Sequence, residues 1–429
     1  MATRRPPRRF LRTLLSRSTF LKLALLYLVW TVIEAQISYY RVARTERESR
    51  AQAVLHEPTR VYIASLHWNN EKILRAEWNR AVVDLVNTLG PENVFVSVYE
   101  SGSWDDSKGA LRELDEELEK TGVARKIILD EETHRDLIDG PPEKEGWITI
   151  PDGRTMPRRI PYLSRLRNLS LQPLRDLAGN GTRFDHVLFL GDVVFSVPDI
   201  ITLIKTNNGH YAAACSLDFS KPPNFYDTFA LRDARGHEHA SQTWPYFRAS
   251  KSRKAMINAQ PVPVSSCWNG IVAMPASSFT GIRGLQFRGI PDSLAAAHHL
   301  EASECCLIHA DNPASRTRGV FVNPAVRVGY NRAAYDAVHP GAHLKTGSEP
   351  PGSGSEGGSS KSWLSLKEIY WGLWRNRVAR WTTTSWFEER EVRRRVERWV
   401  KGGGGGGEKG GFCIVDEMQI VVHNGWKHL

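Results

Sequence analysis

Apolar runs and segments of helical period alternate along the first part of the chain. The β-branched runs Val61–Leu66 and Val94–Tyr99 are each followed by a polar turn, and then by a segment in which apolar residues recur every three or four positions. A third run, Val123–Asp130, follows the second of these segments. Because strands that alternate with helices form a parallel sheet with helices on both faces, the pattern predicts an α/β fold with a mostly parallel central sheet.

The middle of the chain continues this pattern and then becomes irregular. The further elements that we expect are, in chain order, a helix at about 161–177, a strand at 187–190, a helix at about 197–207 and a strand at about 210–219. Residues 225–266 are irregular and rich in aromatic side chains, as loops that hold a substrate often are. We therefore expect the main domain to span residues 58–340.

Two stretches beyond this domain differ from it in composition. Residues 341–361 include the sequence KTGSEPPGSGSEGGSSK, which is typical of a flexible linker. Residues 362–429 begin with a tryptophan- and arginine-rich segment of helical period and end with FCIVDEMQIVVHNGW, which alternates as a strand does. We expect this C-terminal helix and strand to pack on the core. Its tryptophans are expected to pack or to contact a membrane surface rather than to take part in chemistry.

The N-terminal region has the pattern of a membrane anchor. Residues 20–40 are apolar over close to the roughly 20 residues that a helix needs to cross a bilayer. The basic segment 1–19 precedes them, so the positive-inside rule places this tail in the cytosol. No small-residue cleavage site follows, which disfavours a signal peptide, and the unbroken run Leu23–Ile33 disfavours a buried amphipathic helix. We expect a signal-anchor helix at 20–40, a stem at 41–57, and a single-pass type II protein of the Golgi or endoplasmic reticulum membrane, with the main domain in the lumen.

The net charge of +10 does not indicate binding to nucleic acid once the charges are located. Residues 1–22 carry +7 and residues 375–401 carry +5, which leaves the rest of the chain at −2. The domain that would hold any active site is therefore not basic, and we expect no nucleic-acid partner. The five cysteines include the adjacent Cys305 and Cys306, which are poorly placed to pair with each other, and the sequence does not reveal which cysteines form disulfides.

The stretch Phe184–Phe195, FDHVLFLGDVVF, holds a carboxylate in an unusual place. A run typical of a buried strand stops at Gly191 and Asp192, and then apolar residues resume. Ligands of open α/β sheets bind outside the carboxyl ends of the strands, so Asp192 is expected at the ligand-binding edge. A divalent cation held there could bind two phosphate oxygens of a nucleotide diphosphate. An aspartate after a strand can also be a turn or N-cap residue, and the spacing alone does not decide between the two.

Several combinations of rare residues occur in a specific order along the chain. They are ASLHWNNE (64–71), YESGSWDD (99–106), RLRN (165–168), FLGDVVF (189–195), FYDTFALRD (225–233), SSCWNG (265–270) and ECCLIHAD (304–311). By these motifs the chain resembles the fungal capsule-associated α-1,3-mannosyltransferase family, of the cryptococcal mannosyltransferase type, over roughly residues 60–340. The resemblance implies a GT-A-like nucleotide-sugar fold, GDP-mannose as the donor, a mannose-containing glycan or polysaccharide as the acceptor, and a divalent metal such as Mn²⁺ as the cofactor.

The motifs suggest a role for each candidate site residue. We expect Asp192 and Glu304 to be catalytic. GT-A enzymes usually carry Asp-x-Asp, whereas two valines follow Asp192, so a downstream residue is needed to complete the metal site. We expect Asp192 and His309 to bind the metal, with Asp311 and His423 as the other candidates. If an α-linked donor gives an α-linked product, Glu304 need only orient the acceptor hydroxyl. The expected donor-binding residues are Ser65, His67, Asn69, Glu71, Asp105, Asp106 and Arg167. The expected sugar- and acceptor-binding residues are Tyr226, Asp227, Arg232, Trp268, Asn269 and Gly270.

Each of these assignments has a structural alternative. Asp105 or Asp106 could cap the helix that follows, Arg167 could be a solvated surface residue, and His309 could be structural, since isolated histidines often are. The aromatic residues could pack in the core. Of the two sequons, we expect Asn180 rather than Asn168 to be glycosylated, because a glycan beside Arg167 would block the donor site.

The resemblance favours a metal-dependent mannosyltransferase, and it implies an α-1,3 linkage formed with retention. A catalytically inactive glycan-binding or glycan-assembly protein of the same fold remains the alternative, because the second aspartate of Asp-x-Asp is missing. A glycoside hydrolase would need two carboxylates on either side of one sugar, and no such pair can be singled out.

Overall fold

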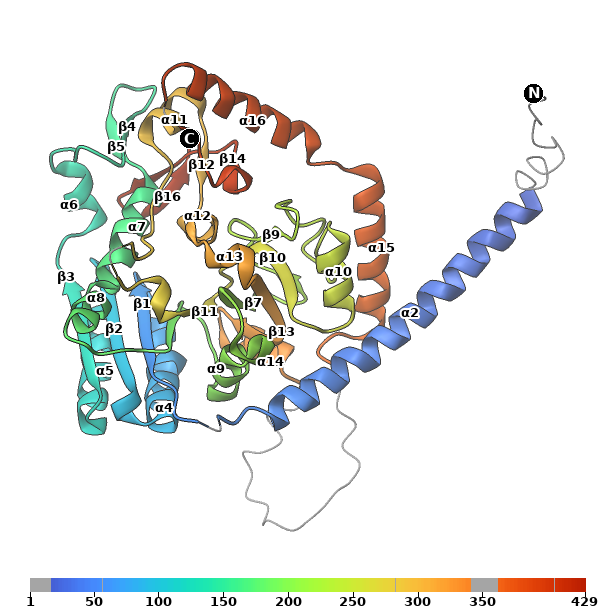
Figure 1. Ribbon diagram of the computed structural model, residues 1–429, viewed down its shortest axis with the longest axis horizontal. Helices are drawn as coiled ribbons and strands as arrows, with labels where there is room; N and C mark the ends of the chain where they lie inside the picture. The colour runs from blue at the N-terminus through green and yellow to red at the C-terminus, as the bar shows by residue number, and fades with distance from the viewer. Residues whose placement is uncertain (1–16, 56, 282, 341–361, 405) are drawn as a thin grey trace, which may run out of the picture.

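The computed structural model describes residues 17–55, 57–281, 283–340, 362–404 and 406–429 (Figure 1). A mixed sheet of ten strands forms its centre, in the order β3-β2-β1-β6-β11-β7-β13-β10-β9, with β8 paired to β7. The strands are β1 (Val61–His67), β2 (Val94–Ser101), β3 (Ala124–Asp130), β6 (His186–Leu190), β7 (Ala213–Lys221), β8 (Asn224–Phe225), β9 (Arg232–Asp233), β10 (Val262–Ser266), β11 (Ile271–Pro275) and β13 (Val320–Gly329). Strands β3, β2, β1 and β6 are mutually parallel, as are β7 and β13. The predicted α/β fold with a mostly parallel central sheet is confirmed.

Alternate side chains of β1 show how the sequence builds two cores. Val61 and Ile63 point to a cluster that includes side chains of α4 (Asn79–Leu89), α5 (Ser107–Thr121) and α9 (Val197–Ile204). Tyr62 and Ala64 point to the other face, which α8 (Gln172–Gly179) and the aromatic loops cover. A strand covered on both faces has few polar positions, which explains why the sequence shows an apolar run here rather than alternation.

The helix expected at about 161–177 is in fact two helices. One residue, Leu171, separates helix α7 (Arg159–Ser170) from α8, and Pro173 lies in the first turn of α8. A proline fits the first turn of a helix but interrupts the hydrogen bonds of a helix interior, so the chain turns here. The break leaves α7 against β1 and β2, with Arg167 near its end.

The N-terminal helix α2 (Arg17–Ala51) extends beyond both ends of the segment expected to cross a membrane. It projects from the domain at its N-terminal end and packs against it at the other end (Figure 1). By length and composition, one helix in the described part of the chain, Ser18–Ser49, is long and apolar enough to cross a bilayer. Most of the expected tail 1–19 lies outside the described residues. The expected stem 41–57 is helical as far as Ala51, and Val42 and Ala43 are buried.

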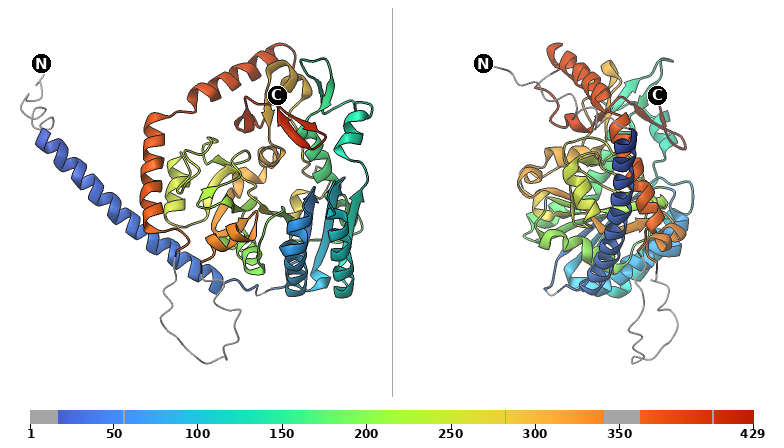
Figure 2. Two further views of the ribbon diagram at one scale, coloured as in Figure 1. Left: turned by 180° about the vertical axis from the view of Figure 1, so that it is seen from behind. Right: turned by 90° about the vertical axis from the view of Figure 1, so that its right-hand side faces the viewer.

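The C-terminal region returns to the core through two helices and three short strands. Helix α15 (Leu366–Thr382) packs along α2, and α16 (Trp386–Lys401) crosses the far end of the domain (Figure 2). Strand β14 (Ile414–Val415) pairs with β12 (Glu301–Ala302), while β15 (Gln419–Val422) pairs with β16 (Gly425–His428). The linker expected at 341–361 lies outside the described residues.

Shorter elements complete the fold. They are α3 (Glu71–Ile73), the π-helical turn Leu74–Trp78, α6 (His134–Asp139), β4 (Trp147–Thr149), β5 (Thr155–Pro157), α10 (Ser250–Ile257), α11 (Asp292–His298), α12 (Glu304–Asp311), α13 (Ala314–Thr317) and α14 (Arg332–Val338). Disulfides join Cys215 to Cys267 and Cys306 to Cys413, which leaves Cys305 as a buried free thiol.

Candidate active site

A large cleft opens at the carboxyl ends of β1 and β6, where the sequence analysis places the ligand. Its volume is about 1310 Å³, which is above the roughly 300–1,000 Å³ of ordinary small-molecule sites. The expected site residues that line it are Ser65, Arg167, Asp192, Tyr226, Asp227, Arg232, Trp268, Gly270 and Glu304. The structure therefore brings together residues that are up to 239 positions apart in the chain.

Two glycines hold the backbone that presents Asp192. The Gly191 amide donates to the carbonyl of Gly270 over 2.8 Å. A Cβ on Gly191 would lie 2.7 Å from that carbonyl oxygen. Gly270 has φ +83°, and a Cβ there would lie 2.7 Å from Val328. Both positions therefore require glycine, which explains why FLGD and CWNG each contain one.

Asp192 is a half-buried carboxylate without an ion-pair partner among the described residues. Burial raises its pKa above the usual range, and the Asn70 amide and the more distant charge of Arg167 oppose that shift only in part. Its Oδ2 accepts a hydrogen bond of 3.1 Å from Asn70 Nδ2. A cation would supply the missing counter-charge. Since Mg²⁺-type sites commonly use one or two carboxylates together with substrate phosphates, the single carboxylate of Asp192 fits a site of this kind.

Asn70 and His67 form a network beneath Asp192. His67 is fully buried, and burial lowers its pKa to about 4, so the ring is neutral near pH 7. Its Nδ1 lies 3.2 Å from Asn70 Oδ1, and its Nε2 lies 2.8 Å from Ser65 Oγ. Asn70 can therefore accept from His67 with one end of its amide and donate to Asp192 with the other. Asn70 lies in the ASLHWNNE motif (64–71), but it is not among the donor-binding residues expected from the sequence.

The other expected donor-binding residues join the first two loops to each other. Asn69 Oδ1 accepts from the Trp104 amide over 2.8 Å, and Asp105 Oδ2 accepts from the Glu71 amide over 3.0 Å. Asp106 caps α5 by accepting from the Gly109 amide, and it forms an ion pair of 2.5 Å with Arg75, which also pairs with Glu71. None of these four residues is among those that line the cleft in the described chain. The helix-capping alternative holds for Asp106.

Arg167 and Glu304 contact each other on the wall of the cleft. Arg167 Nε donates to Glu304 Oε1 over 3.0 Å, and its guanidinium lies 4.6 Å from the centre of the Trp268 ring. Glu304 is 3% exposed and is the first residue of α12, after the N-cap Ser303. Arg167 is therefore not a solvated surface residue, and it holds Glu304 in place.

A buried carboxyl that the sequence analysis did not assign lies behind the cleft. Asp218 in β7 accepts from the Tyr330 hydroxyl over 3.0 Å and from the Asp227 amide over 3.2 Å. Burial raises the pKa of Asp218 to about 7, and the nearby Asp227 contributes. Burial also raises the pKa of Asp227, whose carbonyl accepts from Asn269 Nδ2 over 3.0 Å. The sequence signal is a charge within the apolar strand HYAAACSLDF, the same kind of interruption that singled out Asp192.

The guanidinium of Arg232 donates its hydrogen bonds to backbone carbonyls of the protein. It is 2% exposed and donates to the carbonyls of Phe229 and Leu231, and to that of Phe412 over 2.9 Å. The last of these bonds fastens the C-terminal region to the cleft. Tyr226, by contrast, is 55% exposed and lines the cleft, where its ring lies 4.7 Å from that of Tyr330.

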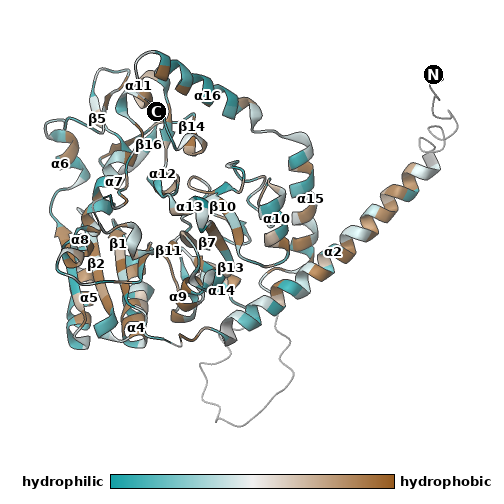
Figure 3. Cartoon of the chain, viewed as in Figure 1, coloured by the Kyte–Doolittle hydropathy of each residue, from teal (hydrophilic) through white to brown (hydrophobic). Residues whose placement is uncertain are grey.

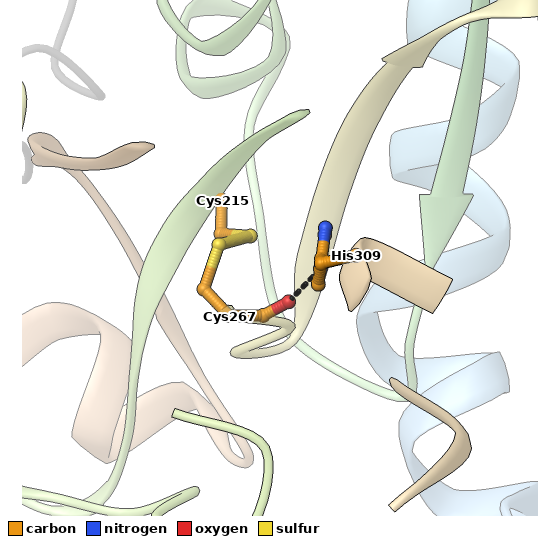
Figure 4. A group of neighbouring side chains, drawn as sticks. All are labelled: Cys215, Cys267 and His309. Atoms are coloured by element: carbon orange, nitrogen blue, oxygen red, sulfur yellow. Dashed lines mark hydrogen bonds between the residues drawn. A yellow bond between two sulfur atoms is a disulfide. The ribbon is translucent and has the colours of Figure 1, made fainter. Parts of the chain in front are cut away.

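The structure does not bring His309 to Asp192. His309 is buried beside the Cys215–Cys267 disulfide, and its Nε2 lies 2.6 Å from the Cys267 carbonyl oxygen (Figure 4). Burial lowers the pKa of His309 to about 4. The two sulfurs and the ring nitrogen lie close enough to hold a metal, but sulfurs that are bonded to each other are not thiolate ligands. In this arrangement His309 positions the Cys267 carbonyl.

The two sequons differ in accessibility. The Asn168 amide is engaged at both ends, because it donates to the Phe287 carbonyl over 2.8 Å and accepts from the Phe287 amide over 3.0 Å. Asn180 is exposed at the end of α8. The geometry is compatible with the expectation that Asn180 is the glycosylated sequon, which stays a prediction.

The C-terminal region forms the wall opposite the sheet. Its residues that line the cleft are Ser385, Glu388, Glu389, Val392, Arg393, Val396, Glu408, Lys409, Gly411, Phe412, Ile414, Val415, Asp416, Glu417, Gln419, Trp426 and His428. The Cys306–Cys413 disulfide fixes this wall to α12, the helix of Glu304. Arg288 adds ion pairs to Glu408, over 2.8 Å, and to Asp311. The cleft is therefore completed by residues far from the motifs that the sequence analysis used.

Comparison with solved structures gives only low overall similarity. The mannosyltransferase PcManGT from Pyrobaculum calidifontis, solved with GDP-Man and Mn²⁺, has 12% identity and a TM-score of 0.35, and the match covers 88% of this chain and 91% of that one. GalNAc-T7 with UDP, GalNAc and Mn²⁺ has 13% identity and a TM-score of 0.35 over 63% of this chain and 42% of that one. S. aureus TarS 1-349 has 10% identity and a TM-score of 0.33 over 62% of this chain. This chain spans 58% of the TarS chain.

Comparison of the sequence itself is more informative. No curated protein sequence matches the chain. One family profile, described as cryptococcal mannosyltransferase 1, matches residues 60–311, which is more than half of the chain and includes Asp192, Asp227 and Glu304. The expected resemblance is confirmed, and the chain belongs to the cryptococcal mannosyltransferase 1 family.

Proposed function

We propose that this protein transfers mannose from GDP-mannose to a mannose-containing glycan, and that it forms an α-1,3 linkage with retention. The observation that carries the proposal is Asp192, a half-buried carboxylate without an ion-pair partner in the described chain, on the wall of a cleft in a member of a mannosyltransferase family. The cleft is large enough to hold a nucleotide sugar and part of an acceptor together. We propose that the domain works as a GT-A-like nucleotide-sugar fold.

Asp192 would hold a divalent cation such as Mn²⁺ together with the donor phosphates. When bound, the cation neutralises the negative charge that develops on the departing GDP. The chain itself keeps Asp192 in place, because Asn70 donates to one of its carboxylate oxygens. His67 supports Asn70 from below and stays uncharged, so it does not compete for the carboxylate.

Glu304 and Arg167 would act on the acceptor side of the donor sugar. Glu304 can accept a hydrogen bond from the acceptor hydroxyl and orient it, while Arg167 keeps the carboxylate of Glu304 in position. Tyr226 offers an exposed aromatic face on which a pyranose ring can rest, while the buried ring of Trp268 supports the Arg167 guanidinium beside it. The C-terminal wall would bound the acceptor, since it faces the strand ends across the cleft.

The cellular setting of the proposal rests on α2. Its apolar part, within residues 20–40, would anchor the protein as a single-pass type II protein of the Golgi or endoplasmic reticulum membrane, with the cleft in the lumen.

A panel of nucleotide sugars tests the proposal. Purified full-length protein is incubated with each sugar and a mannose oligosaccharide, with Mn²⁺ or with a chelator, and released nucleotide and extended product are measured. We expect product with GDP-mannose and Mn²⁺ only. Binding of the oligosaccharide without transfer from any donor would overturn the proposal and favour a glycan-binding protein.

A further inference from the structure

Helix α2 is docked on the domain along part of the segment expected to cross the membrane. From Thr31 onward buried residues of α2 recur every three or four positions, at Thr31, Ala35, Ser38, Val42 and Glu46, and Ala43 beside Val42 is buried as well. The part of α2 without a buried side chain, Ser18–Trp30, has 13 residues, and at 1.5 Å per residue it is only about 20 Å long. The hydrocarbon core of a bilayer is about 30 Å thick. A bilayer that α2 crosses must therefore extend to the part of α2 that the domain covers.

Helix α15 lies against α2 at this level. Arg377 donates to Thr31 Oγ1 over 2.7 Å and forms an ion pair with Glu34. The ring of Trp374 lies 5.4 Å from that of Tyr27. Tyr27, Thr31 and Glu34 all fall within the expected span of residues 20–40, so α15 stands beside the span rather than above it (Figure 2). The pairing with Glu34 neutralises Arg377, as an environment of low dielectric constant requires.

The outer face of α15 has the composition of a membrane-interface helix. Trp371, Val378 and Trp381 are 54%, 46% and 62% exposed. Their spacing of seven and three residues places them on one face, which also carries the exposed Lys367 and Arg375. Tryptophan anchors helices at the boundary between lipid and water, and lysine and arginine extend their charges to the headgroups.

This face is continuous with the apolar surface of α2. The Trp381 ring lies 6.5 Å from the ring of Trp374, which in turn contacts Tyr27. On α2 the exposed apolar side chains are Phe20, Leu21, Leu23, Leu25, Leu26, Tyr27, Leu28, Val29, Trp30, Val32, Ile33, Ile37 and Tyr40. Figure 3 shows the hydrophobic colour along the projecting part of α2 and patches of it on α15. One occupant fits the whole surface, namely a lipid bilayer.

We propose that the outer face of α15 is a second membrane contact, which lies in the lipid interface beside the anchor helix. Helix α15 has four basic residues and one acidic residue, so anionic headgroups would strengthen the contact. The inference rests on the anchoring role of α2 and is independent of the proposed reaction. This second contact holds the domain close to the membrane instead of leaving it on a flexible stem.

Site-specific fluorescence of the full-length protein tests the proposal. A cysteine that carries an environment-sensitive NBD label replaces Val378 in α15, and single chains are placed in nanodiscs of phosphatidylcholine and phosphatidylserine, with or without nitroxide-labelled lipid. The same label at Leu26 reports on the anchor, and a label at Lys120, exposed on α5, reports on the aqueous surface. Each labelled variant is used only if its circular dichroism matches that of the parent.

We expect the labels at Val378 and Leu26 to emit at shorter wavelength and to lose most of their intensity to the nitroxide lipid, while the label at Lys120 is unaffected. Quenching at Leu26 without quenching at Val378 would overturn the second contact and leave the anchor intact. Absence of quenching at both positions would overturn the anchor as well. Binding of GDP-mannose to the protein in the same nanodiscs is measured separately, so that a failure of the membrane contact can be told apart from a failure of the proposed function.

Discussion

Replacing Glu46 should show that the segment expected to be a stem is part of the folded domain. Glu46 lies on α2 and is 6% exposed, and its carboxylate is 3.1 Å from Arg327 Nη2. Arg327 is 2% exposed, and its other donors reach the carbonyls of Val338 and Pro324. Glu46→Ala leaves a buried guanidinium without its counter-charge. Breaking a buried pair in this way costs about 3–5 kcal/mol of unfolding free energy.

Glu48→Ala is the matched control. Glu48 lies on the same helix, and its pair with Arg44 is exposed, with side-chain exposures of 50% and 79%. An exposed pair of this kind contributes at most about 0.5 kcal/mol. Because both changes are Glu to Ala in one helix, the difference between them isolates the buried pair.

Equilibrium unfolding in urea, followed by near-ultraviolet circular dichroism in a mild detergent, measures both variants. We expect the free energy of unfolding to fall by at least about 2 kcal/mol more in Glu46→Ala than in Glu48→Ala. Adding Arg327→Met to Glu46→Ala should recover part of the loss, because it removes the uncompensated charge. Equal stability of the two single variants would refute the docking of α2 through Glu46.

Three further results are expected. The free energy of unfolding should fall as the pH is lowered from 7 to 5, by about 2 kcal/mol for each of His67 and His309. The folded protein holds both rings neutral, with pKa values of about 4, while the unfolded chain protonates them near 6.5. In His309→Gln the urea concentration at the unfolding midpoint should therefore depend less on pH. Replacing Cys306 and Cys413 by serine should cost roughly 4–5 kcal/mol, since the disulfide closes a loop of 107 residues, and hydrogen exchange in the C-terminal wall should accelerate. A chain without residues 1–45 should unfold at lower urea concentration than the full chain, because Arg377 of α15 loses its ion pair with Glu34.

The sequence was most informative where a charge interrupts an apolar run. Asp192 was predicted at the ligand edge because it follows a strand, and the structure places it on the cleft wall. Asp218 carries the same signal but could be given no role from the sequence, because only the fold shows that Tyr330 and Asp227 contact it. Asn70 was missed because an amide in a polar loop has no distinctive pattern, and its contact with Asp192 is made across 122 positions of the chain.

Other features depend on contacts that no local pattern encodes. The sequence could not pair Cys215 with Cys267, and so could not show that a disulfide occupies the surroundings of His309. Thr31 and Ser38 look like neutral residues of a membrane helix, yet they face the domain. Asp199 looks like a surface residue of a short helix, but its carboxylate is buried and accepts from the Tyr335 hydroxyl over 2.7 Å.

Mannose transfer by an Asp192→Asn variant tests the central claim most directly. The substitution keeps the shape of the side chain and removes the charge, and Asp176→Asn, exposed on α8, is the matched control. Transfer from GDP-mannose to a mannose oligosaccharide is measured with Mn²⁺, together with donor affinity by calorimetry. The account predicts that Asp192→Asn stays folded, loses Mn²⁺-dependent donor binding, and transfers at least about 100-fold more slowly, because the charge stabilisation is worth several kcal/mol, while Asp176→Asn matches the parent. An Asp192→Asn protein that binds the donor and transfers mannose at the parent rate would contradict the account.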